Sequence, residues 1–160
     1  MRKMVLCVSL LGLMAAAYAR AEEPLVGKWQ LIFMRVGEIK DMPKPLPSIN
    51  ITQSGSALQF EYMVGLEGKV FRTFRARLDG SAADVINDKG QKVGTARLTK
   101  SGGKYTLILQ TAKGAPEAGK LSLSQEGRIL TIESDAIIPG HGASPTHIVQ
   151  QFARPGVVPY

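Results

Sequence analysis

The sequence predicts an all-β domain, an antiparallel up-and-down β-barrel of about eight to ten strands. From residue 25 onward, apolar and polar residues alternate with the period of two that a half-buried strand requires. Turn-forming pairs such as Asp79 and Gly80 interrupt this alternation at short intervals, with no helical stripe between them. A sandwich has similar strand spacing, but a barrel is favoured because nearly every connection is a short hairpin and closure leaves no exposed edge.

The strands can be placed in order along the chain. The first, at residues 25–33, carries Trp29 and Phe33 on its apolar face. Three prolines in the segment 41–47 exclude a helix there and predict an extended loop. The clearest alternation is at residues 57–64. The expected strands are residues 25–33, 48–53, 57–64, 69–78, 85–86, 91–99, 104–111, 121–124, 128–138 and 146–154.

Residues 1–21 have the composition of a cleaved signal peptide. Arg2 and Lys3 precede an apolar run, and small residues at 19 and 21 provide a signal-peptidase site after Ala21, or after Ala19 as the alternative. The apolar run is too short for a membrane anchor, which needs roughly 20 residues. We therefore expect export to the periplasm or out of the cell, with residues 22–160 as a single domain.

Composition limits the functions that remain. Hydrophobic residues make up 44% of the chain and charged residues 21%, which excludes a disordered protein. The net charge is +7, but cleavage after Ala21 removes three of the 20 basic residues and none of the 13 acidic ones, leaving +4. This small excess predicts no nucleic-acid partner. Cys7 is the only cysteine and lies in the signal segment, so the core alone must stabilise the processed chain.

Two short motifs carry a resemblance to a known family. The stretch Leu25–Leu31, with Gly27 and Trp29, resembles the G-x-W opening of lipocalin-like (calycin-type) barrels. The hairpin Leu121–Ile132 is similar to one in small exported bacterial proteins with that opening, although Glu126 stands where those proteins more often have Asp. The resemblance implies that an Arg near the end of the last strand, here Arg154, covers Trp29. A guanidinium over an indole face gains about 0.5–2 kcal/mol, so this pair is expected to be structural.

The sequence has no motif that predicts catalysis. Hydrolase, phosphate-loop, dinucleotide and metalloprotease patterns are all absent from it. His141 and His147 are the only histidines, and their spacing is unlike that of a zinc site, although Asp135 and Glu133 are near in sequence. We expect solvated histidines, no metal, no cofactor and no enzymatic activity.

A ligand site is predicted from one charged residue. Alternation places Arg72 on the same strand face as Phe74, so an inward apolar face turns Arg72 inward too. A buried guanidinium needs an acidic partner or a ligand anion, because an unpaired buried charge costs several kcal/mol. Pairing with an acid, or an outward orientation, remains the alternative. Phe60, Tyr62, Phe74 and Tyr105 are expected to line the same cavity, or else to be plain core.

These observations leave two main functions open. The first is an exported lipocalin-like protein that binds a small apolar or amphipathic molecule, such as an amphipathic anion, in a pocket opposite Trp29. The alternative is a barrel with a filled core that acts as an envelope or secreted interaction protein through its loops. The sequence identifies neither the ligand nor a protein partner.

Overall fold

The structure is a computed structural model that describes residues 22–111, 116–124, 126–137 and 144–156. The predicted signal peptide at 1–21, with both cleavage sites, lies outside these residues, and so does His141. Within the described residues, no helix is long and apolar enough to cross a membrane.

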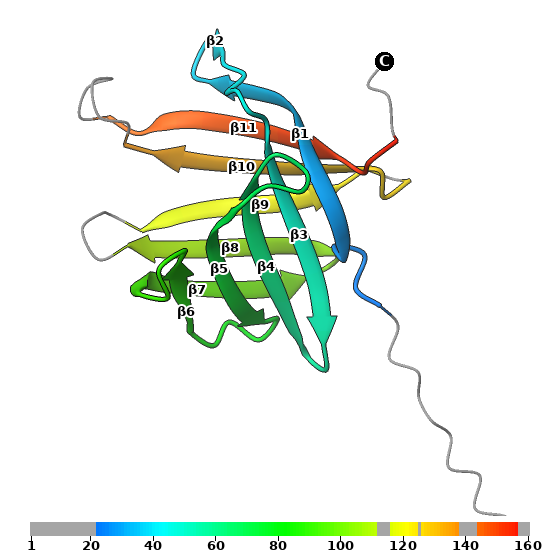
Figure 1. Ribbon diagram of the computed structural model, residues 1–160, viewed down its shortest axis with the longest axis vertical. Coiled ribbons are helices and arrows are strands. Elements are labelled where there is room, and N and C mark those ends of the chain that lie inside the picture. Colours follow the sequence, from blue (N-terminus) through cyan, green and yellow to red (C-terminus); the bar gives the residue numbers. More distant parts are fainter. Residues whose placement is uncertain (1–21, 112–115, 125, 138–143, 157–160) are drawn as a thin grey trace, which may run out of the picture.

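The described strands form one antiparallel sheet that closes on itself (Figure 1). Strand β1 pairs with β3 on one side and with β11 on the other, so ten strands complete the barrel. The short strand β2 pairs only with the end of β1. The all-β antiparallel barrel expected from the alternation is therefore confirmed. The strands are β1 (Gly27–Val36), β2 (Ile39–Lys40), β3 (Pro47–Ser54), β4 (Ala57–Val64), β5 (Val70–Arg77), β6 (Ala83–Asn87), β7 (Lys92–Ser101), β8 (Lys104–Thr111), β9 (Glu117–Leu123), β10 (Ile129–Ala136) and β11 (Thr146–Ala153).

The barrel has two faces whose strands cross one another. In Figure 1 the strands β3–β5 run across the direction of β8–β11, and the long strand β1 lies beside both β3 and β11. From β3 to β11, strand order follows chain order, because successive strands are hydrogen-bonded neighbours; β1, and not β2, is the other neighbour of β3. In a regular strand, every second side chain points into the barrel, so all the strands contribute to its interior.

One end of the barrel is filled with packed side chains. The rings of Phe60 on β4 and Phe74 on β5 stack with centroids 4.8 Å apart. Full burial of a large apolar side chain stabilises a fold by roughly 1.5–3 kcal/mol. The largest fully buried apolar side chains are Leu25, Trp29, Leu31, Ile49, Ile51, Leu58, Phe60, Phe74, Leu98, Leu121 and Leu130.

Trp29 and Arg154 close this packed end. The Arg154 guanidinium carbon lies 4.4 Å from the centre of the Trp29 ring, as the resemblance implies. The Trp29 Nε1–H donates to the Leu25 carbonyl at 2.8 Å, so the buried indole has no unpaired donor. Arg154 donates to the backbone carbonyls of Val26 at 3.0 Å, Pro24 at 3.0 Å and Gly127 at 3.1 Å. One side chain therefore joins the start of the barrel to the turn between β9 and β10.

Glu23 ties the chain before β1 to the same end. Its carboxylate accepts hydrogen bonds from Lys100 Nζ at 2.7 Å and from the Tyr105 hydroxyl at 2.9 Å. The Glu23 hydrogen bond raises the pKa of Lys100. Burial, and then the Glu23 carboxylate, raises the pKa of Tyr105. The Tyr105 hydroxyl is thus held at the packed end of the barrel.

Candidate ligand site

The other end of the barrel is hollow. A cavity of about 270 Å³ lies between the strands there. Its wall is mostly apolar, with five polar or charged side chains among its members. The lining residues are Met34, Pro47, Tyr62, Phe71, Arg72, Leu107, Leu109, Glu117, Gly119, Ile132, Ser134, Ile148, Gln150 and Phe152.

A β-bulge in β1 brings Met34 into the cavity wall. The register with β11 shifts between Leu31 and Phe33, so the strand faces invert at that point. The sequence prediction that Phe33 shares the inward face of Trp29 is therefore wrong. Met34 lines the cavity instead. The Phe33 ring lies 5.7 Å from Lys40 Nζ on β2.

A second bulge shapes the mouth of the cavity between β4 and β5. Tyr62 pairs with Arg72, but the next pair is Met63 with Val70, so Phe71 is the extra residue. Phe71 is 40% exposed, and its ring centroid lies 6.3 Å from that of Tyr62. The bulge thus allows Phe71 and its neighbour Arg72 both to line the cavity, although adjacent residues of a regular strand face opposite ways.

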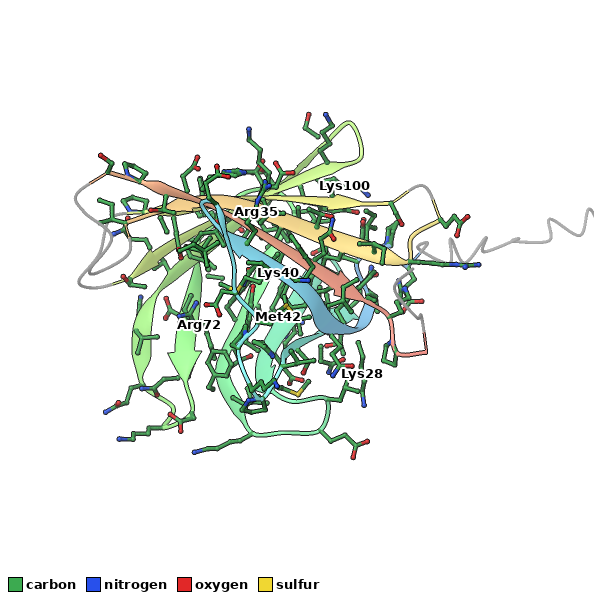
Figure 2. All side chains as sticks on the ribbon, turned by 90° about the horizontal axis from the view of Figure 1, so that it is seen from above. Lys28, Arg35, Lys40, Met42, Arg72 and Lys100 are labelled. Atoms are coloured by element: carbon green, nitrogen blue, oxygen red, sulfur yellow. The ribbon has the colours of Figure 1, made fainter. Side chains whose placement is uncertain are left out.

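Arg72 lies in the cavity wall without a partner in the described part of the chain. It shares the face of Phe74 and Ala76, which are both buried, and is itself half-buried. No ion pair or hydrogen bond joins its side chain to another described residue, although its backbone pairs with β4 and β6. Figure 2 shows Arg72 toward the end of the barrel that lies away from Lys28 and Lys100. An arginine in this position has five donors available for an anion that enters the cavity.

Tyr62 and Glu117 are the titratable neighbours of Arg72 in this wall. Burial raises the pKa of the Tyr62 hydroxyl to about 12; the positive charge of Arg72 opposes this shift, and the negative charge of Glu117 adds to it. The Tyr62 hydroxyl therefore stays protonated at neutral pH and can donate a hydrogen bond to a bound anion.

Of the residues predicted to bind a ligand, some line the cavity and the others lie in the packed part of the barrel. Arg72 and Tyr62 line the cavity, whereas Phe60, Phe74 and Tyr105 are not part of its wall. Phe60 and Phe74 lie one inward position deeper on β4 and β5, where their rings stack and fill the barrel. Tyr105 is 2% exposed and bonds to Glu23 at the packed end. The expectation that these three residues line the cavity is thus corrected.

Glu117 is the charged lining residue that the sequence prediction missed. The segment 112–119 reads as a loop because it is rich in Gly, Ala and Pro, but β9 already begins at Glu117. Its face could have been found by following the alternation of Leu121 backwards through Gly119. Gln150 and Ser134, the other polar lining residues, were also not singled out.

His147, the histidine that the structure describes, lies next to an aspartate on β10. His147 Nδ1 lies 2.9 Å from Asp135 Oδ1, and both side chains are at least half exposed. Within residues 22–111, 116–124, 126–137 and 144–156, no group of three or more His, Cys, Asp or Glu side chains could hold a metal ion.

Apolar side chains also surround the mouth of the cavity. Of the large hydrophobic residues that are exposed in the described chain, four lie at or next to strand ends: Ile39 in β2, Val64 at the end of β4, Phe71 near the start of β5 and Ile137 just after β10. The fifth, Ile108, lies in the middle of β8. Exposed apolar groups gathered in one region are typical of a surface that contacts a ligand or a partner.

Comparison with known proteins identifies the fold and no family. No family model matches the chain, and no curated protein matches its sequence. Zebrafish ileal bile acid-binding protein, solved with cholic acid, superposes with a TM-score of 0.55 at 18% identity, over 82% of this chain and 98% of that one. The fluorescent protein UnaG superposes with the same TM-score at 15% identity, over 82% and 98%. A UnaG mutant gives 0.57 at 14% identity, over 82% and 96%. The protein thus shares the closed antiparallel barrel of these structures.

Proposed function

We propose that this protein is an exported, lipocalin-like binding protein that holds a small amphipathic anion in the hollow end of its barrel. It acts in the periplasm or outside the cell, without catalysis and without a cofactor. The anionic group of the ligand binds Arg72 and the Tyr62 hydroxyl. Its apolar part contacts side chains such as Leu107, Ile132 and Phe152.

The observation that carries this proposal is Arg72 in the wall of a mostly apolar cavity, with no ion pair or hydrogen bond from its side chain to any other described residue. A half-buried guanidinium that lacks a partner is costly, and a ligand carboxylate or phosphate offsets that cost by a two-pronged, charge-assisted contact. Tyr62 supports the same ligand group because its hydroxyl is a donor at neutral pH.

The size of the cavity limits the ligand. About 270 Å³ corresponds to about nine water molecules at liquid density, near the lower end of ligand pockets. A larger amphiphile would extend past the mouth, where Phe71 and Ile137 are exposed. The fold likeness supports this class of ligand, since one matched structure is a bile acid-binding protein with cholic acid.

The test is titration of the purified protein with dodecanoate and dodecyl phosphate, comparing wild type with Arg72→Leu. We expect the variant to bind at least tenfold more weakly, which corresponds to about 1.4 kcal/mol. Arg75→Leu is the matched control, because Arg75 is exposed on the same strand and bonds outward to the Ser54 hydroxyl. Equal affinities in wild type and Arg72→Leu would refute the anchor.

Export has its own test. The amino-terminal sequence of the protein isolated from its native host is expected to begin at Glu22, or at Arg20 if cleavage follows Ala19. Retention of Met1 on the mature protein would contradict export.

The apolar mouth favours a second candidate, an interaction protein that acts through its loops. Ile39 is 61% exposed and Ile137 57% exposed, and neither lines the cavity. This candidate takes the lead if wild-type protein binds neither anion and a co-purifying protein is lost on Ile39→Ser and Ile137→Ser substitution.

A further inference from the structure

The cavity wall holds two opposite charges on strands that are not neighbours. Arg72 is on β5 and Glu117 is on β9. Three strands, β6, β7 and β8, separate β5 from β9 in the sheet. Because the sheet is closed, both residues line the same cavity from different sides.

The two charges do not pair with each other. Among the described residues, no ion pair joins the Arg72 guanidinium to the Glu117 carboxylate. Glu117, like Arg72, also has no hydrogen bond to another described side chain. Two half-buried opposite charges gain by direct contact, so their separation leaves the space between them for a group that satisfies both.

Tyr62 lines the same cavity as Arg72 and Glu117, and both charges act on its hydroxyl. It pairs with Arg72 in the strand register. The Arg72 charge lowers the pKa of its hydroxyl, and the Glu117 charge raises it. The polar part of the cavity is thus a short array of one cation, one phenolic donor and one anion, next to a larger apolar wall.

We infer that the ligand is a zwitterionic amphiphile, whose anionic group binds Arg72 and whose ammonium group binds Glu117. This inference rests on the proposed function and specifies the ligand class of that site. A simple fatty anion satisfies Arg72 but leaves the Glu117 carboxylate beside a second negative charge, which disfavours it. A ligand with an α-ammonium group donates to Glu117 and removes that repulsion.

The experiment compares three probes of equal chain length: dodecanoate, its α-hydroxy derivative and its α-amino derivative. Binding to the purified protein is measured by isothermal titration calorimetry at neutral pH. We expect the α-amino probe to bind wild type at least tenfold more tightly than dodecanoate, and the α-hydroxy probe to lie between them. Glu117→Gln keeps the shape and removes the charge, so this preference should fall to threefold or less. Glu133→Gln, an exposed position on neighbouring β10, should retain the preference.

The outcomes separate the inference from the proposed function. If dodecanoate binds and depends on Arg72, but the α-amino group gives no preference in wild type, the zwitterion inference is overturned and the binding function stands. If the preference persists in Glu117→Gln with an unchanged melting temperature, Glu117 is not the partner and the inference is again overturned. If none of the three probes binds wild type, the proposed function and the inference both fail.

Discussion

Gly27 leaves vacant the space that the Arg154 guanidinium occupies. A Cβ atom added at Gly27 would overlap Arg154 Nη1, and the backbone there has φ of +138°, a conformation that only glycine adopts without strain. The opening glycine is therefore needed for two reasons at once. It permits the positive φ at the start of β1, and it leaves room for the arginine that follows β11 to lie over Trp29.

Gly27→Ala is expected to lower the free energy of unfolding by about 2–4 kcal/mol. It displaces a guanidinium that makes one cation–π contact and backbone hydrogen bonds, and it adds backbone strain. Gly55→Ala is the matched control, because Gly55 also has positive φ but nothing lies within 4 Å of its added Cβ. Urea denaturation of both variants checks this. Equal losses in the two would show that strain alone matters.

Trp29→Ala is expected to cost about 3–5 kcal/mol of unfolding free energy. Trp29 is 0% exposed, so truncation leaves a cavity at the packed end and removes the ring beneath Arg154. Trp29→Phe keeps a ring and should lose less. The same denaturation assay measures both, and a Trp29→Ala variant as stable as wild type would be inconsistent with a buried plug.

Gly119→Val should weaken ligand binding at least tenfold without loss of stability. Gly119 lines the cavity, and a Cβ there would meet Ile132 Cγ2 at 3.5 Å, an ordinary contact distance. The branched side chain therefore fills empty space instead of displacing its neighbours. Calorimetric titration with dodecanoate should show at least a tenfold loss of affinity, while the melting temperature stays the same or rises. Undiminished binding would place the ligand elsewhere.

Tyr62 makes stability fall in alkaline solution. Its pKa is about 12 in the folded protein and 10.0 when the chain is unfolded. Because the folded state holds this proton more tightly, its stabilising effect is complete below pH 10 and is lost as the pH rises through 12, by up to about 2–3 kcal/mol. Absorbance of the phenolate should show one tyrosine titrating last, and Tyr62→Phe should remove that step. A last step that survives in Tyr62→Phe belongs to another residue.

Alternation of apolar and polar residues predicts where the strands lie. It does not predict the β-bulges at which the inward and outward faces of a strand exchange. The predicted strand at 57–64 coincides with β4 because every second residue there is apolar. Residues 31–34 of β1 are all apolar, so no alternation marks the bulge that turns Phe33 out and Met34 in. A bulge adds one residue to one strand, and only the partner strand defines where it falls.

The sequence predicts which side chains of the candidate site point into the barrel, but not how far along the barrel axis each one lies. Arg72, Phe74 and Tyr62 are on inward faces, as the period of two indicates. Which of them meet a cavity depends on their level along the barrel axis, which is set by the tilt and stagger of all ten strands together. Phe74 is one inward position from Arg72 and is already part of the packed half. Tyr105 is likewise on an inward face, but its level along the barrel axis places it at the packed end, away from the cavity.

The pairing of β1 with β11 has a consequence for how the chain folds. The first and last strands of the barrel form its closing seam, from Gln30 with Ala153 to Val36 with Ile148. All other seams join strands that are close in sequence, so the meander from β3 to β11 can assemble progressively during synthesis. The edge of β1 that pairs with β11 has no partner strand until β11 has been synthesised. Trp29, which is on β1, is therefore not fully enclosed before then. Folding rate should therefore depend more on substitutions along this seam than on those in any hairpin, and the newly made chain stays open until its last strand arrives.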